Sequence, residues 1–136
     1  MGVAQSLSLF FAAGALGGLA TSLVVWLCGE SGLSHALGVA IAPELTPAFL
    51  YPRIVWGGLW GFLFALPLGV RSAVRHGLLL SLAPTAYQLL VVFPRAGRGA
   101  LGLELGALTP VLVLGWNAVW GVVAAWWLRG TRGHAG

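Results

Sequence analysis

Four long apolar runs constrain this chain of 136 residues more than any other feature. They extend from about residue 6 to 28, 52 to 70, 77 to 93 and 106 to 128. A run of roughly 20 apolar residues is long enough to cross the hydrocarbon core of a bilayer as a helix. Hydrophobic residues make up 59% of the chain and charged residues only 7%, which excludes an ordinary water-soluble domain. The sequence therefore predicts an all-α membrane protein, a single domain over residues 1–136 with a bundle of four transmembrane helices.

One passage of the sequence occurs twice, about sixty residues apart. The two copies share three markers in the same order, namely Ala-Leu-Gly at 36–38 and 100–102, Leu-Thr-Pro at 45–47 and 108–110, and Trp-x-x-x-Trp-Gly at 56–61 and 116–121. This order predicts two parallel helical-hairpin repeats, the first over about 6–70 and the second over about 77–129, followed by a tail at 130–136. In duplicated membrane proteins the functional site commonly lies where the halves meet.

The charged residues bear on topology rather than on nucleic-acid binding. All seven basic residues are arginines, and they are too dispersed to form a nucleic-acid surface. The four-span arrangement places four arginines on one side of the membrane, which are Arg71, Arg75, Arg129 and Arg132. It places three on the other side, which are Arg53, Arg95 and Arg98. Because cytoplasmic loops carry an excess of arginine, we expect both termini in the cytoplasm, in a bacterial cytoplasmic membrane.

The two outer connectors differ in length and composition. The first, 29–51, has Leu33, Leu37 and Ile41 at helical spacing before Pro43, which predicts a short helix that lies on the membrane surface or dips into it. The second, 94–105, is shorter and rich in glycine, and we expect it to be irregular.

The Leu-Thr-Pro markers predict helix starts at Thr46 and Thr109. Threonine caps the free amides of a first turn, and proline is well tolerated at the first helical position. Pro52 indicates that the second helix either restarts or is kinked there. The simplest interpretation is that both markers are only caps. The alternative is that two positive helix ends, joined by Arg53, attract an anion or a lipid phosphate. An ion pair of Arg53 with Glu44 or Glu30 would remove that site.

Each Trp-x-x-x-Trp-Gly motif places two indoles on one helical face, since residues four apart lie one turn from each other. The indoles concerned are Trp56, Trp60, Trp116 and Trp120. They are expected to pack against grooves lined by glycines such as Gly14, Gly17 and Gly18 of the first helix. The face with Gly57 and Gly61 is expected to adjoin another helix, and Gly121 is a further helix-packing residue. The alternative role is to stack on a hydrophobic ligand such as a quinone, a pigment or a lipid tail.

Asn117 stands in the last span where the first repeat has Gly57. An amide in hydrocarbon needs a hydrogen-bonding partner, and Asn117 would pair with one of the available polar groups on other helices, which are those of Gln88, Thr85, Ser81, Thr21 and Ser22. This pair would join two helices or line a solute path. No acidic residue, histidine or lysine lies in the middle of a span, which counts against a proton-driven pump.

Catalytic and metal-binding patterns are missing from the sequence. Cys28 is the single cysteine, and His35, His76 and His134 fall in separate parts of the chain. No serine, histidine and carboxylate form a convincing triad, and no phosphate-binding glycine loop is present. We therefore expect neither an enzyme nor a cofactor or metal site.

These observations favour a non-enzymatic subunit or assembly partner of a membrane complex or homo-oligomer. The alternative is a small channel or carrier for an anionic or amphipathic solute with an outer vestibule around Arg53. The expected partners are the lipid bilayer, other membrane subunits or a second copy of the chain, and an anionic lipid or hydrophobic ligand, but no nucleic acid.

Overall fold

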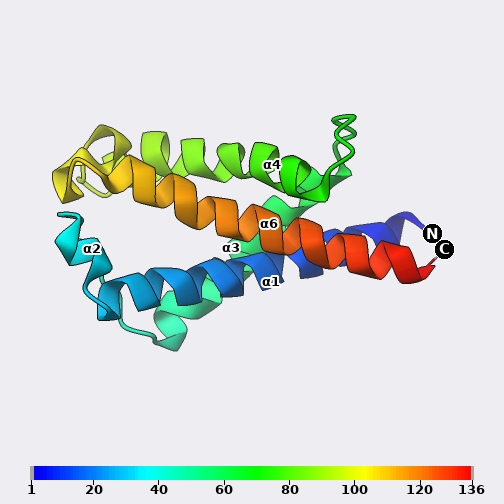
Figure 1. Ribbon diagram of the computed structural model, residues 1–136, viewed down its shortest axis with the longest axis horizontal. Coiled ribbons are helices and arrows are strands. Elements are labelled where there is room, and N and C mark those ends of the chain that lie inside the picture. Colours follow the sequence, from blue (N-terminus) through cyan, green and yellow to red (C-terminus); the bar gives the residue numbers. More distant parts are fainter. Residues whose placement is uncertain (1, 136) are drawn as a thin grey trace.

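The computed structural model describes residues 2–135, with side chains described as far as Thr131. Four long helical segments dominate it, and Figure 1 shows them running side by side. Their bounds are α1 Val3–Glu30, then α3 Pro47–Gly61 with the 3-10 turn η1 Phe62–Ala65, then α4 Ala73–Tyr87 with the π-helical η2 Gln88–Val92 and the short α5 Phe93–Arg95, and finally α6 Thr109–Ala135.

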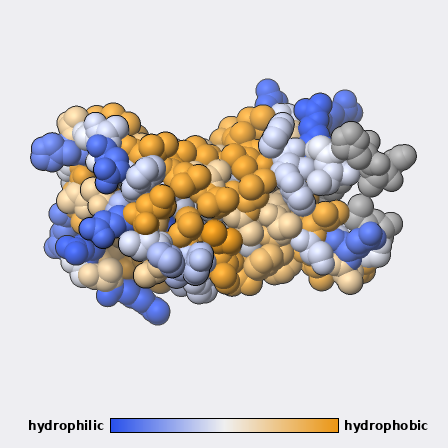
Figure 2. All heavy atoms as spheres, turned by 90° about the horizontal axis from the view of Figure 1, so that it is seen from below, coloured by the Kyte–Doolittle hydropathy of each residue, from blue (hydrophilic) through white to orange (hydrophobic). Residues whose placement is uncertain are grey.

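All four segments are long and apolar enough to span a membrane. Figure 2 agrees with this, because hydrophobic residues form a band across the middle of the molecule and hydrophilic residues gather at both ends. The predictions of an all-helical fold and of four helices able to cross a membrane by length and composition are confirmed.

The second span differs from the predicted 52–70. It begins at Pro47, where Thr46 caps the helix by accepting a hydrogen bond from the amide of Phe49 at 3.2 Å. Pro52 lies inside this helix rather than at its start. The helix ends at Ala65, because Pro67 disfavours a helical conformation for the residue before it. The other spans differ from prediction by a few residues at their ends.

The two connectors pack against each other at one end of the bundle, which we call the connector end. The helix expected around residues 33–41 is shorter than predicted, because α2 covers only Leu33–Ala36 and the chain then turns at Gly38 with φ +73°. The second connector contains the 3-10 segment η3, Ala100–Leu105. The amide of Ala40 donates to the carbonyl of Leu105 at 2.9 Å, which joins the two connectors.

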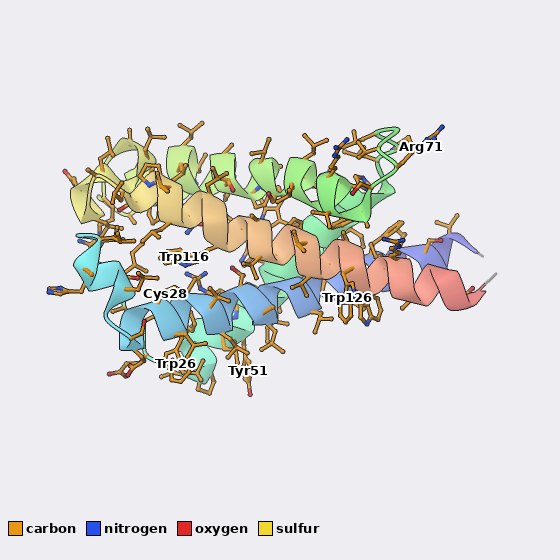
Figure 3. All side chains as sticks on the ribbon, in the orientation of Figure 1. Trp26, Cys28, Tyr51, Arg71, Trp116 and Trp126 are labelled. Atoms are coloured by element: carbon orange, nitrogen blue, oxygen red, sulfur yellow. The ribbon has the colours of Figure 1, made fainter. Side chains whose placement is uncertain are left out.

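Both chain termini lie at the opposite end, which we call the terminal end (Figure 1). Helices α3 and α6 both run from the connector end towards the terminal end, whereas α1 and α4 run the other way (Figure 1). Arg71, in the loop between α3 and α4, also lies at the terminal end (Figure 3). The side chain of Arg132, counted in the topology above, lies outside the described residues.

Glycines bring α1 and α3 into backbone contact. A Cβ atom at Gly14 would overlap the carbonyl oxygen of Gly57, and one at Gly61 would overlap the carbonyl oxygen of Phe10. A Cβ at Gly18 would lie 2.6 Å from the carbonyl oxygen of Arg53. No larger residue fits at these positions without separating the helices.

A second glycine contact joins α4 to α6, where Gly77 and Gly121 face each other so closely that a Cβ on either would overlap the other's carbonyl oxygen. Helix α6 also packs on α1 along the centre of the bundle. Helices α3 and α4, by contrast, are not packed on each other along their lengths. The four helices therefore form an open ring, with contacts between α3 and α1, α1 and α6, and α6 and α4, and with an opening between α3 and α4.

Candidate functional site

The opening between α3 and α4 forms a pocket of about 400 Å³. Its two walls come from α3 and from the α4–η2 segment, and its floor comes from α1 and α6. The lining residues are Gly18, Thr21, Pro52, Arg53, Trp56, Gly57, Trp60, Pro84, Tyr87, Gln88, Val92, Asn117 and Trp120. A volume of this size is typical of a small-molecule site. All four membrane-spanning segments contribute to it.

Arg53 is the charged residue among those lining the pocket. Its side chain is half-buried, and its guanidinium carbon lies 4.6 Å from the centre of the Phe49 ring in a cation–π contact. Among the side chains that the structure describes, which include Glu30 and Glu44, no carboxylate forms an ion pair with it. The positive charge of Arg53 is therefore left without a neutralising partner inside a membrane span.

The four motif tryptophans fall into two groups, one on α3 and one on α6, which differ in burial. Trp56 and Trp60 of α3 line the pocket, and Trp56 is 56% exposed. Trp60 crosses the pocket to meet Tyr87 of α4, with ring centres 5.7 Å apart in an edge-to-face arrangement. These aromatic rings give the pocket a largely apolar wall.

Trp116 and Trp120 of α6 are both buried, and Trp116 points from α6 into the interior between the helices (Figure 3). The indole N–H of Trp120 donates to the carbonyl oxygens of Gly14 and Gly57, at 3.1 and 3.3 Å. Trp120 therefore joins three helices, and its ring also forms part of the pocket floor. Gly17 packs directly against this ring, as expected from the sequence.

Gln88 and Asn117 meet at the pocket, where the Asn117 side-chain amide donates to the Gln88 carbonyl oxygen at 3.4 Å. Gln88 is the first residue of the π-helical segment η2. The buried Pro84, four residues earlier, has no N–H and so weakens the regular helical ladder there. π-Helical turns often occur at functional sites.

The two Leu-Thr-Pro threonines do not line the pocket. Thr46 caps α3, whereas Thr109 lies at the start of α6 with a fully buried hydroxyl that has no hydrogen-bond partner among the described residues. The structure thus places the pocket around Arg53 without bringing Thr46 and Thr109 into its lining.

Sequence reasoning missed Pro84, Tyr87 and Val92 as lining residues. A proline followed by tyrosine and glutamine inside an apolar span was the available signal for Pro84 and Tyr87. Which face of α4 is directed towards α3 depends on the packing of all four helices, and hydropathy does not reveal it.

In the described residues, no group of three or more histidine, cysteine, aspartate or glutamate side chains is placed to bind a metal ion. His76 packs edge-to-face against Phe64, with ring centres 5.3 Å apart, and its buried Nε2 has no hydrogen-bond partner.

Comparisons of the chain with protein-family models, with curated proteins and with solved structures found no match.

Proposed function

We propose that this protein binds an anionic amphipathic lipid of the surrounding bilayer in the pocket between α3 and α4, and acts as a lipid-binding or carrier protein rather than as an enzyme. The observation that carries the proposal is the unpaired Arg53 guanidinium beside an apolar aromatic wall within a transmembrane helix. Such a combination suits a ligand with a negative headgroup and a hydrocarbon body.

The position of Arg53 along α3 supports a lipid headgroup as the partner. Arg53 follows Pro47 by six residues, so its Cα lies about 9 Å from the connector end of the helix at 1.5 Å per residue. A charge deep in hydrocarbon costs about 3 kcal/mol on insertion scales, unless it pairs or reaches the interface. A phosphate or carboxylate drawn towards Arg53 would neutralise the charge there.

The exposed rim of the pocket supports entry from the bilayer. Trp56, Tyr87 and Val92 line the pocket and are exposed, at 56%, 42% and 41%. Since α3 and α4 are apolar enough to span a membrane, the gap between them faces lipid. An amphipathic molecule could therefore enter sideways, with its chains against the aromatic wall.

The proposal includes the two-repeat organisation expected from the sequence. Gly61 and Gly121 occupy the same place in the two Trp-x-x-x-Trp-Gly motifs, and each contacts a glycine of the helix that precedes it in its own half, Gly14 or Gly77. Gly38 and Gly102, in the two Ala-Leu-Gly markers, both have positive φ, at +73° and +68°. These correspondences support parallel hairpin repeats with the pocket between them.

The second candidate is the role expected first, a subunit or assembly partner of a membrane complex or homo-oligomer. It is favoured by the lateral gap between α3 and α4, into which a helix of another subunit could pack. The glycines support this role less than the sequence suggested, because the large glycine faces of α1 and α3 already pack against each other within the chain. Gly115 of α6 is an exception, with open space beside it.

The proposed setting is a bacterial cytoplasmic membrane with both termini in the cytoplasm and the connector end outside. The charge distribution supports this orientation, since Arg71 lies in the loop at the terminal end and Arg75 lies in the first turn of α4, which begins there. The lipid would then be bound from the outer half of the bilayer.

Native mass spectrometry of the purified protein tests the proposal. The parent should retain phosphatidylglycerol in preference to phosphatidylcholine, and Arg53→Gln should lower this preference about tenfold, since a charge-assisted contact is lost. Arg95→Gln is the matched control, because Arg95 is exposed at the same end of the molecule and does not line the pocket. Equal lipid retention by all three proteins would overturn the proposal. Retention of a protein subunit in place of lipid would favour the second candidate.

A further inference from the structure

The amide pair formed by Gln88 and Asn117 at the pocket has unused hydrogen-bonding capacity. The two side-chain amides together carry four N–H bonds and two carbonyl oxygens. Among the described residues they make one hydrogen bond, from Asn117 Nδ2 to Gln88 Oε1, and at 3.4 Å it is a long one. Three N–H donors of the pair and the Asn117 carbonyl oxygen are therefore free, and both side chains line the pocket.

Other polar side chains in the same region are already satisfied within the protein. The hydroxyl of Thr85 donates to the Ser81 carbonyl at 2.8 Å, and the hydroxyl of Ser81 donates to the Leu78 carbonyl at 2.7 Å. Thr21, which also lines the pocket, donates to the Trp116 carbonyl. The amide pair thus differs from its neighbours in keeping spare donors on residues that line the pocket.

A role in joining α4 to α6 does not explain why the Gln88–Asn117 amide pair is present. These helices are already in backbone contact at Gly77 and Gly121, two turns or more from the amides along α4. A single long hydrogen bond adds little to such a contact, whereas unsatisfied amide groups in hydrocarbon are costly. A partner from within the pocket would remove that cost.

The chemistry of this partner follows from the excess of donors over acceptors. A carbonyl oxygen accepts hydrogen bonds and donates none, so it matches the three free N–H groups better than a hydroxyl or an amine does. In a diacyl glycerolipid, two ester carbonyl groups lie on the hydrocarbon side of the headgroup phosphate. The lipid class proposed above therefore offers this acceptor at a short distance from its charge.

The depths of the residues agree with this arrangement. Gln88 precedes the end of its span at Arg95 by seven residues, and Asn117 follows the start of α6 at Thr109 by eight, which places them about 10 and 12 Å from the connector end. Arg53 lies about 9 Å from that end, and its long side chain is able to extend towards the interface. A headgroup at Arg53 thus leaves the ester groups near the level of the amides.

We propose that Gln88 and Asn117 form a second polar subsite, which donates hydrogen bonds to an ester carbonyl of an anionic diacyl glycerolipid whose headgroup is bound by Arg53. This inference rests on the proposed function and names its ligand more narrowly. It makes Gln88 a specificity-determining residue that distinguishes ester-linked from ether-linked chains.

The test compares two forms of phosphatidylglycerol with the same chain length, one with ester and one with ether linkages, in competition for the full-length protein by native mass spectrometry. The two lipids differ only in their ester carbonyl oxygens, which the ether form lacks. The parent should retain the diester form about fivefold more than the diether form, the value of one net hydrogen bond. The double variant Gln88→Leu/Asn117→Leu, which removes every amide donor of the subsite, should reduce this ratio to about one, while the control Gln5→Leu, at an exposed position of α1 outside the pocket, should leave it unchanged.

Equal retention of the two lipids by the parent protein would overturn the proposal of an ester-binding subsite. This measurement uses the parent alone, so it does not depend on whether a variant folds. A diester preference that persists in the double variant would overturn it as well. Both results are independent of the comparison between phosphatidylglycerol and phosphatidylcholine in Arg53→Gln, so failure of the subsite and failure of the headgroup site are distinguishable.

Discussion

The indole Nε1 of Trp120 lies 3.1 Å from the carbonyl oxygen of Gly14, at the point where α6 crosses α1. The same N–H also reaches the carbonyl oxygen of Gly57 on α3, at 3.3 Å. Helical carbonyl oxygens have a second lone pair, which the glycine contact leaves accessible to a donor from a third helix. A single buried side chain, 3% exposed, thereby connects the first half of the chain to the last helix.

Trp120→Phe should therefore destabilise the bundle. The phenyl ring preserves much of the packing but removes the only N–H directed at these two carbonyls among the described side chains, so we expect a loss of about 1 kcal/mol and a lower melting temperature in detergent. Trp126→Phe is the control, because Trp126 is 68% exposed on the surface of α6. Equal melting temperatures for the two variants would contradict the role of the hydrogen bond.

Gly61→Leu should reduce the yield of folded protein sharply, because a side chain at Gly61 would overlap the backbone of α1 at Phe10 and Gly14. Gly57→Leu should behave in the same way for the same reason. Size-exclusion chromatography and thermal melting provide the measurement. Gly115→Leu is the matched control, since a Cβ atom at Gly115 would have nothing within 4 Å of it. If Gly61→Leu and Gly115→Leu were equally stable, the close α1–α3 contact would be disproved.

The four-span topology predicts opposite locations for the two ends of the molecule. In a Cys28→Ser background, a cysteine introduced at the exposed position Arg75 should be labelled from the cytoplasm. A cysteine at the exposed position His35 should be labelled by an impermeant thiol reagent from outside intact cells. Ser34 is unsuitable for this test because it is 1% exposed. Labelling of both positions from one side would rule out the arrangement.

Much of the fold is accessible from the sequence because length and hydropathy decide whether a helix can cross a membrane. The glycine positions were also informative, since Gly14, Gly57 and Gly61 do occur where backbones meet. Hydropathy did not predict where the second span begins and ends. Leu66, Leu68 and Val70 are as apolar as the helix itself, but Pro67 and Gly69 prevent them from continuing it, and the cap at Thr46 extends the helix in the other direction.

The candidate site was predictable only in part. Arg53 and Asn117 are conspicuous as polar residues within apolar runs, and both line the pocket. The pocket itself arises because α1 packs on α6 while α3 and α4 remain apart. In two equivalent repeats α1 corresponds to α4 and α3 to α6, so the duplicated sequence would suggest that α3 packs on α4 as α6 packs on α1. The different roles of Trp60 and Trp120, one in the pocket wall and one bonded to Gly14, follow from the same asymmetry.

An experimental structure of the protein in bilayer nanodiscs containing phosphatidylglycerol would show what occupies the pocket. We expect a lipid between α3 and α4, with its phosphate within hydrogen-bonding distance of the Arg53 guanidinium and a chain against Trp56 and Trp60. An ion pair of Arg53 with Glu44, or a helix of another subunit in the gap between α3 and α4, would contradict lipid binding at this site.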